Sequence, residues 1–203
     1  GVVCNQWGDT GKGKLVDLLA ALWADIIIRG TGGANAGHTI VVKGQKHIFH
    51  LLPSGILHDV TGKINVIGRG VAFDPQAVID ELDILHIAGI DVKNFKISHQ
   101  APLVLPYHIL IDRIGDKAQQ IGTTGRGIGP LYTDYTARHS LFLNDIFNKD
   151  LFREKLTKYL ASKKSILAGL DKNVAKEVLA HPHLASGIYF NPETILDVEA
   201  IVA

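Results

Sequence analysis

The chain has 203 residues, of which 46% are hydrophobic and 20% charged, and its formal net charge at neutral pH is +1. This length and composition indicate a globular protein with a hydrophobic core. The small net charge argues against nucleic-acid binding through bulk electrostatics. The single cysteine, Cys4, excludes an internal disulfide bond and favours a reducing compartment, so we expect a cytoplasmic protein. The most apolar stretch, residues 101–111, is too short and too interrupted by prolines to span a membrane.

The first predicted elements are a short buried strand over residues 2–4 and an amphipathic helix over residues 15–23, joined by a glycine-rich loop. The loop has the sequence Gln6-Trp7-Gly8-Asp9-Thr10-Gly11-Lys12-Gly13-Lys14. Glycines let the backbone turn tightly and direct successive N–H groups at one anion, and the following helix adds its free N–H groups and positive dipole end. The loop is therefore predicted to bind phosphate, with Lys12 and Lys14 supplying positive charge.

This loop fits the nucleotide-binding pattern G-x-x-x-x-G-K-[ST] only in part. Gly8 and Gly13-Lys14 fit the pattern, but Leu15 stands where the usual Mg²⁺-binding hydroxyl would be. Asp9 lies inside the loop instead, and its carboxylate can hold a metal ion, act as a base, or do both. The alternative is a strand-to-helix turn that binds no ligand.

The next segments predict a parallel sheet followed by a hairpin. A strand over residues 25–29 completes a βαβ unit with residues 2–4 and the first helix. Residues 30–39 contain four glycines and one asparagine, which predicts neither a helix nor a regular strand but a loop that a ligand can approach closely. Residues 39–42 and 47–51 alternate in polarity around 43–46, which predicts a hairpin, and a turn follows at 53–55.

A further strand and helix are predicted in the middle of the chain. The strand covers residues 64–67. Asp74 is predicted to cap the next helix, Pro75 to begin it and Gly89 to end it. The apolar positions expected on its buried face are Val78, Ile79, Leu82 and Leu85.

Helical patterns dominate the rest of the chain, after a weak strand over residues 95–98. Helices are predicted over 106–119, from Leu143 onward, and over 171–180. We therefore predict a single α/β nucleotide-binding domain over residues 1–203. It would have a mostly parallel central sheet with flanking helices, the phosphate-binding loop, an additional hairpin, and a mainly helical segment over 144–203.

Residues 121–130 form a third glycine-rich segment. Its glycines alternate with Thr123, Thr124 and Arg126. Hydroxyl groups, backbone N–H groups and guanidinium groups are the donors that bind phosphate, so this segment is predicted to be a second phosphate-binding loop. A flexible connecting loop is the alternative. Arg138 and His139 follow in a short polar patch.

Four blocks of this sequence, in the same order, resemble the adenylosuccinate synthetase family. The blocks are residues 6–14, 32–39, 52–57 and 121–130. The resemblance covers residues 2 to about 150. It implies a GTP-dependent carbon–nitrogen ligase that joins IMP and L-aspartate with GTP hydrolysis, through a 6-phosphoryl-IMP intermediate, in AMP synthesis.

The resemblance also implies roles for individual residues. Asp9 matches the base that takes the N1 proton of IMP, His38 the group on the leaving-group side, and Lys12 the cation that stabilises the transferred phosphoryl group. The positions matching GTP phosphate ligands are Gly8, Gly11, Lys12, Gly13, Lys14, Gly37 and Thr39. Those matching IMP ligands are Asp9, Asn35, Thr124 and Arg138, and those matching Mg²⁺ ligands are Asp9 and the Gly37 carbonyl. In the family, the residue matching Arg138 reaches the partner's nucleotide, so we expect a homodimer.

Two positions depart from the family pattern, because Thr10 stands where the family usually has Glu and Ala34 where it usually has His. The family's later blocks, which bind aspartate and select guanine, have no match here. Together with the lack of methionine, this suggests a part of a longer protein. Two other interpretations stay open: a nucleotide-binding module of the same ancestry without ligase activity, and a phosphotransferase or NTPase that uses the loop on another acceptor.

Overall fold

A computed structural model describes residues 1–3, 11–42, 44–119, 122–168 and 198–202. The chain divides into two compact units, an N-terminal unit, Gly1–Ala101, and a C-terminal unit, Pro102–Ala203. Each unit is described by itself, and the single domain expected over residues 1–203 stays a prediction.

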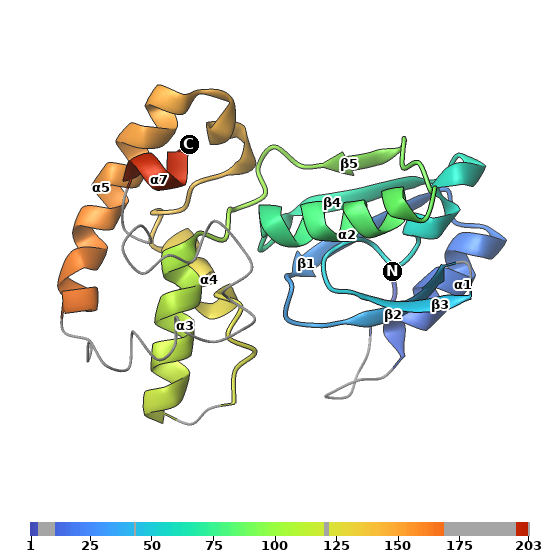
Figure 1. Ribbon diagram of the computed structural model, residues 1–203, viewed down its shortest axis with the longest axis horizontal. Helices are drawn as coiled ribbons and strands as arrows, with labels where there is room; N and C mark the ends of the chain where they lie inside the picture. The colour runs from blue at the N-terminus through green and yellow to red at the C-terminus, as the bar shows by residue number, and fades with distance from the viewer. Residues whose placement is uncertain (4–10, 43, 120–121, 169–197, 203) are drawn as a thin grey trace. The chain divides into compact units, whose positions relative to one another are not determined.

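The N-terminal unit is built on a parallel sheet with the strand order β1-β4-β5, formed by β1 (Ile26–Gly32), β4 (Ile64–Val71) and β5 (Phe95–Ile97) (Figure 1). The predicted parallel sheet and three of its strands are therefore confirmed. Residues 1–3 do not form a strand, so the prediction of a first strand for the βαβ unit is wrong at residues 2 and 3. Val3 is 86% exposed, which shows that a short apolar run alone does not bury a strand. Cys4 lies outside the described residues.

β1 ends three residues later than predicted, inside the glycine-rich segment, where no regular strand was expected. The reason lies in its partner strand, since a Cβ added to Gly70 of β4 would lie 2.5 Å from the carbonyl oxygen of Gly30. The absence of a side chain there lets the two backbones approach closely enough to pair. The register shifts between Arg29 and Thr31, so the strand continues past an irregularity.

An antiparallel hairpin is formed by β2 (His38–Val42) and β3 (Gln45–Phe49), as predicted. Its turn is shorter than the expected 43–46, because Val42 already pairs with Gln45. Gly44 has a φ of 82°, and this left-handed conformation lets two residues reverse the chain.

Two α-helices and a 3₁₀ helix complete this unit: α1 (Lys12–Leu22), η1 (Ile56–Thr61) and α2 (Pro75–Ile87). Asp74 caps α2 as predicted, since its side chain accepts hydrogen bonds from the N–H groups of Gln76 and Ala77. One predicted face residue is wrong, because Ile79 is 50% exposed. The apolar face of α1 is also largely exposed, and Ala20 is its buried residue. The largest fully buried side chains of the unit are Phe49, Leu51, Leu52, Ile56, Ile67 and Leu85.

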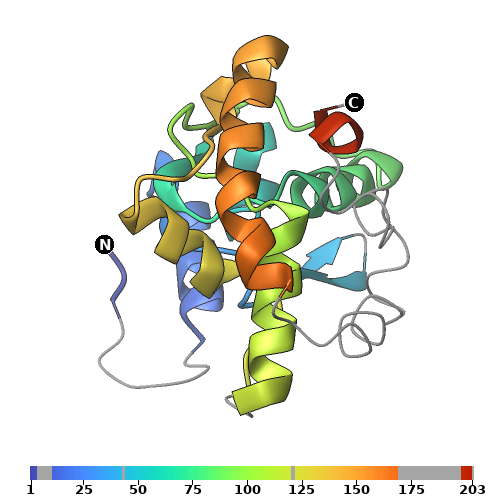
Figure 2. The same cartoon turned by 90° about the vertical axis from the view of Figure 1, so that its left-hand side faces the viewer.

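The C-terminal unit is helical over its described residues. It contains α3 (Pro106–Gln119), α4 (Ile128–Thr136), η2 (Leu143–Phe147), α5 (Lys149–Ala168) and α7 (Val198–Val202). α3 has the predicted bounds, whereas α4 begins inside the segment 121–130 that was predicted as loop. α7 lies against α5 (Figure 2), where Arg153 Nε donates to Glu199 Oε1 over 2.7 Å. The helix predicted over 171–180 lies outside the described residues.

The core of this unit joins α3, α4 and α5 to the segments that precede α3 and η2. Its fully buried side chains are Leu103, Tyr107, Leu131, Leu141, Leu156 and Leu160. Within the described ranges, none of the helices has the length and apolarity that crossing a bilayer would require.

Candidate nucleotide-binding site

The start of α1 is arranged to receive an anion. Gly11 precedes the helix in a left-handed conformation (φ 73°) and has no side chain with which to cap the first-turn N–H groups. The first turn contains no acidic residue, and Lys12 and Lys14 are both exposed. A helix start that has no side-chain cap in the described part of the chain, a positive dipole end and two lysines favours phosphate binding.

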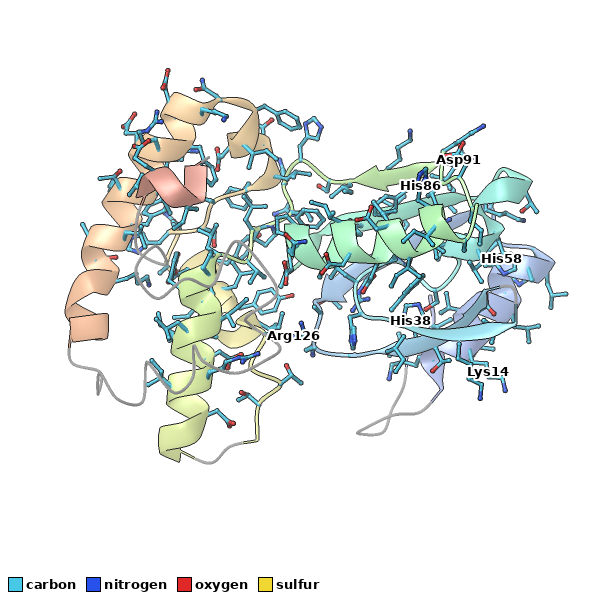
Figure 3. The ribbon with its side chains drawn as sticks, in the orientation of Figure 1. Lys14, His38, His58, His86, Asp91 and Arg126 are labelled. Atoms are coloured by element: carbon cyan, nitrogen blue, oxygen red, sulfur yellow. The ribbon has the colours of Figure 1, made fainter. Side chains whose placement is uncertain are left out.

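Gly13 brings the hairpin against this helix start. A Cβ added at Gly13 would lie 2.9 Å from the His38 Cβ and 3.4 Å from the Ser54 Oγ, so a larger residue would push β2 away. The structure thus brings Gly13 and His38, two residues predicted from sequence, into contact. Figure 3 shows His38 on β2 and Lys14 on α1 within the same unit.

His38 is neutral at neutral pH in this unliganded chain. Burial lowers its pKa to about 4, with further lowering by the positive charge of Arg29 and by His50, while Asp17 opposes the shift. Its Nε2 atom is buried and has no hydrogen-bond partner in the described part of the chain. An imidazolium, the form expected for a residue beside a leaving phosphate, therefore requires an anion close to this ring.

Arg29 of β1 fixes the loop that carries the predicted residues Asn35 and Gly37. Its guanidinium donates to the carbonyl oxygens of His50 and Gly33, each over 2.5 Å. The Asn35 Oδ1 accepts from the Gly33 N–H over 3.1 Å, which closes a tight turn. At Gly37 a Cβ would lie 2.9 Å from a methyl carbon of Ile48, so a larger residue would require the Ile48 side chain of β3 to shift.

Glu81 of α2 is a structural residue that the sequence analysis did not single out. Its carboxylate is 5% exposed and accepts the backbone N–H groups of His50, Leu51 and Leu52 at distances from 2.5 to 3.2 Å. It fixes the chain directly after β3. A signal was present, because Glu81 lies three residues after Val78 and four before Leu85, in the apolar stripe of the helix.

In the C-terminal unit, α3 holds the glycine-rich loop 122–127. The Asp116 Oδ1 accepts from the N–H groups of Gly122 (2.7 Å) and Thr123 (2.9 Å), and the Asp112 Oδ2 accepts from that of Gly127 (2.8 Å). The Arg113 Nε donates to the Gly125 carbonyl over 3.0 Å. Thr124, the predicted IMP ligand, is exposed within this loop.

Arg138, the second predicted ligand in this unit, directly follows the end of α4. Its φ of 62° is the sole positive φ at a non-glycine residue in the described chain. The N–H of Arg138 donates to the Tyr135 carbonyl (3.1 Å) and that of His139 to the Asp134 carbonyl (2.8 Å). These two bonds form a Schellman motif, in which glycine usually occupies the position that Arg138 fills.

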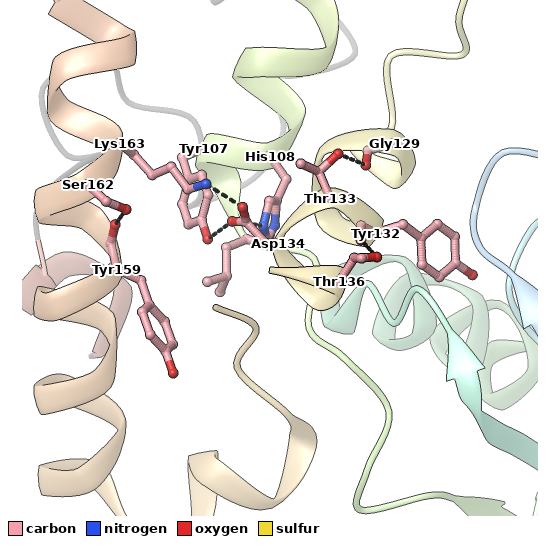
Figure 4. Close-up of polar contacts among 11 residues, drawn as sticks. Tyr107, His108, Gly129, Tyr132, Thr133, Asp134, Thr136, Tyr159, Ser162 and Lys163 are labelled. Carbon is pink, nitrogen blue, oxygen red and sulfur yellow. Dashed lines mark hydrogen bonds and ion pairs between the residues drawn. The ribbon is translucent and has the colours of Figure 1, made fainter. Parts of the chain in front are cut away.

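A buried polar network links α3, α4 and α5 behind this helix end (Figure 4). The Asp134 carboxylate accepts from Tyr107 Oη (2.9 Å) and pairs with His108 Nε2 (3.2 Å) and Lys163 Nζ. The Leu105 N–H donates to His108 Nδ1, which fixes the ring proton on Nε2. Burial alone would raise the pKa of Asp134, but hydrogen bonds from His108, Lys163 and Tyr107 outweigh it and lower the pKa to about 2.

The remaining predicted residues are placed as follows. Thr39 is exposed on β2, opposite Ile48, and Ala34 is 2% exposed. Gly8, Asp9 and Thr10 lie outside the described residues. Among the residues that are described, no group of three or more His, Cys, Asp or Glu side chains is placed to hold a metal ion.

The fold and the helix start together indicate an α/β protein of the nucleotide-binding kind, with a candidate phosphate-binding site at the start of α1. Comparison with known proteins narrows this class. A sequence model of the family described as adenylosuccinate synthetase matches residues 1–202, so the chain belongs to the adenylosuccinate synthetase family.

Individual relatives agree with this assignment. The chain is 49% identical over 158 residues to an adenylosuccinate synthetase from Halothermothrix orenii, a match that covers 76% of this chain and 36% of that protein. It is 39% identical over 211 residues to one from Alkaliphilus metalliredigens, covering 100% of this chain and 49% of that protein. The structure of fully ligated adenylosuccinate synthetase from Plasmodium falciparum matches with a TM-score of 0.71 at 34% identity, covering 85% of this chain and 41% of that one. The chain therefore spans less than half the length of these relatives.

Proposed function

We propose that this chain carries the phosphate-transfer part of an adenylosuccinate synthetase, which joins IMP and L-aspartate with hydrolysis of GTP in AMP synthesis. The observation that carries the proposal is the packing of His38 against Gly13 at the uncapped start of α1. This packing puts an imidazole with an unpartnered ring nitrogen beside the helix end that would receive the GTP phosphates.

The chemistry needs a base, a phosphoryl donor and a positive charge at the leaving group. Asp9 would take the N1 proton of IMP, which sends negative charge to O6. O6 would then attack the γ-phosphorus of GTP, and GDP would leave with the electron pair of the broken P–O bond. The aspartate amine would displace the phosphate from C6 of the 6-phosphoryl-IMP intermediate.

Two residues would stabilise this transfer. Lys12, exposed in the first turn of α1, would neutralise charge on the transferred group. His38 is neutral without ligand, and the negative charge of a bound triphosphate would raise its pKa toward the protonated form. It would then donate to the leaving phosphate oxygen.

Mg²⁺ is the metal that fits this donor set. The carboxylate of Asp9 and the carbonyl of Gly37, an exposed residue of the loop before β2, are both hard oxygen donors. Those two residues would hold the ion. When bound, Mg²⁺ would neutralise charge on the GTP phosphates.

IMP would be held by Asp9 and Asn35 and by Thr124 and Arg138 of the C-terminal unit. The left-handed backbone at Arg138 supports a role for this side chain, because an arginine in a position that favours glycine has a cost to stability. Arg138 would reach the nucleotide of the partner subunit in a homodimer. The lone cysteine suits the cytoplasm as the site of action.

The test is a phosphate-release assay on the purified chain, with each substrate left out in turn. Release that requires IMP, GTP and aspartate together supports the ligase, and Asp9→Ala should then abolish it without changing the circular dichroism spectrum. Release without IMP would indicate an NTPase.

A second candidate is a nucleotide-binding module of the same ancestry without ligase activity. It would use the same helix start, with Lys12 and Lys14, to bind phosphate, and it would lack the transfer step. A module of this kind would bind GTP or IMP in equilibrium dialysis and release no phosphate with all three substrates present.

A further inference from the structure

The loop 122–127 of the C-terminal unit is held along its length by one polar stripe of α3. The stripe consists of Asp112, Arg113 and Asp116, which a helix places on neighbouring turns. Its carboxylates accept three backbone N–H groups of the loop, and its guanidinium donates to one loop carbonyl. The two ends and the middle of the loop are therefore each tied to the same rigid element.

Steric fit reinforces these bonds. A Cβ added at Gly125 would lie 2.9 Å from the Cγ of Arg113, and one added at Gly127 would lie 2.9 Å from the backbone nitrogen of Ile109. Both glycines also have positive φ, 60° and 75°. Glycine at these two positions therefore lets the loop lie close to α3, because a side chain at Gly127 would collide with the helix backbone and one at Gly125 with Arg113.

The charges of the stripe suit a loop that meets an anion. Arg126 lies close enough to Arg113 to lower the pKa of the Arg113 guanidinium, after the larger effect of burial, while Asp112 opposes the shift. Two guanidinium groups, those of Arg113 and Arg126, therefore lie at the loop. The carboxylates of Asp112 and Asp116 accept backbone N–H groups at its ends. Thr124 remains exposed between the anchored ends.

We propose that Asp112, Arg113 and Asp116 are positioning residues that hold the loop 122–127 in the conformation that presents Thr124 to the phosphate of IMP. This inference rests on the proposed function for its ligand. It assigns to α3 a part in substrate binding that acts through the backbone of the loop, without contact between the stripe and the nucleotide.

The experiment combines amide hydrogen exchange by NMR with binding of IMP and of GTP to the same variants of the full chain. Asp116→Ala should speed exchange at Gly122 and Thr123 by about tenfold or more, because it removes a charged acceptor. It should weaken IMP binding by a similar factor and leave GTP binding unchanged. Asp116→Asn keeps an acceptor oxygen and should restore a large part of the IMP affinity. The matched control is Glu154→Ala, which removes an exposed carboxylate on α5 and should change none of these values.

Each other outcome counts against the inference. Unchanged exchange at Gly122 and Thr123 in Asp116→Ala would show that α3 does not hold the loop. Faster exchange with unaltered IMP affinity would show that the loop's conformation is irrelevant to the nucleotide. Equal weakening of IMP and GTP would indicate general damage to the fold. Failure of the unaltered chain to bind IMP would contradict the proposed function and the claim that the loop presents Thr124 to IMP. The amide exchange rates of Asp116→Ala would then decide whether α3 holds the loop.

Discussion

Arg138 combines a left-handed backbone conformation with a proposed role in binding IMP. A left-handed conformation costs an ordinary residue roughly 1–2 kcal/mol relative to glycine. At the equivalent position after α2 the chain has Gly89, with a φ of 72° and the same pair of capping hydrogen bonds. The two helix ends have the same geometry, so the arginine after α4 is not required by the fold.

Arg138→Gly should therefore stabilise the chain while removing a ligand group. We expect the free energy of unfolding in urea to rise by roughly 0.5–1 kcal/mol, since the relief of strain exceeds the added flexibility of the unfolded chain. IMP binding should fall at the same time. The matched control is Gly89→Ala, which should lower stability by a similar amount. A loss of stability in Arg138→Gly would show that the side chain supports the fold.

His38 should titrate far below an ordinary histidine. NMR titration of the ring in the free chain, assigned with His38→Asn, should give a pKa of about 4. A non-hydrolysable GTP analogue should raise that pKa by at least about one unit, because an opposite charge nearby favours the protonated ring. Titration near 6.5 in the free chain would contradict the burial seen here.

The same shift makes stability depend on pH in a defined direction. Between pH 4 and pH 6.5 the unfolded chain binds the proton that folded His38 excludes, so stability falls as the pH drops through this window. His38→Asn should reduce that loss by up to about 3 kcal/mol, at about 1.36 kcal/mol per pKa unit. Burial also lowers the pKa of His108, which makes stability fall with pH in the same direction. This effect is common to the unaltered chain and His38→Asn, so the difference between their pH profiles isolates His38.

At the scale of elements, Glu81 shows how one side chain joins a helix to a loop. Glu81→Ala should lower the free energy of unfolding by about 2–4 kcal/mol, because it leaves consecutive buried N–H groups without an acceptor. Glu81→Gln should lose less. Asp83→Ala, an exposed position on the same helix, is the control and should stay within about 0.5 kcal/mol of the unaltered chain. Equal stability of Glu81→Ala and Asp83→Ala in urea unfolding would contradict this role.

The elements also show what periodicity and turn residues can predict. The helix over 106–119 and the cap at Asp74 follow from local signals, and both are confirmed. The extension of β1 to Gly32 could not be predicted, because it depends on Gly70, which lies on the neighbouring strand. The start of α4 was missed because Gly127, which punctuates a loop in sequence, here precedes a helix.

The candidate site likewise contains features that the sequence predicts and features that it does not. The sequence blocks single out Gly13 and His38, and the two residues are in contact in the structure, while their roles stay predictions. The pKa of His38 was not predictable, since it depends on burial and on Arg29 from another strand. The stripe on α3 was likewise hidden, because two aspartates on a helix face are usually only solvated.

At the scale of the whole molecule, the chain matches its family from residue 1 to residue 202 but spans less than half of its relatives' length. The two units contribute different residues to the proposed reaction. The N-terminal unit would hold the GTP phosphates, and the C-terminal unit would supply Thr124 and Arg138 to IMP. The account therefore requires that both units serve a single transfer of phosphorus to the purine oxygen.

Transfer of the purine oxygen to phosphate is the most direct test of that claim. IMP labelled with ¹⁸O at the 6-position is incubated with the chain, GTP and aspartate, and the released phosphate is analysed by mass spectrometry. The account predicts that the heavy oxygen appears in the phosphate, and that Asp9→Ala releases none. Phosphate that carries only solvent oxygen would show that water, and not the purine, attacks the γ-phosphorus, and would contradict the account.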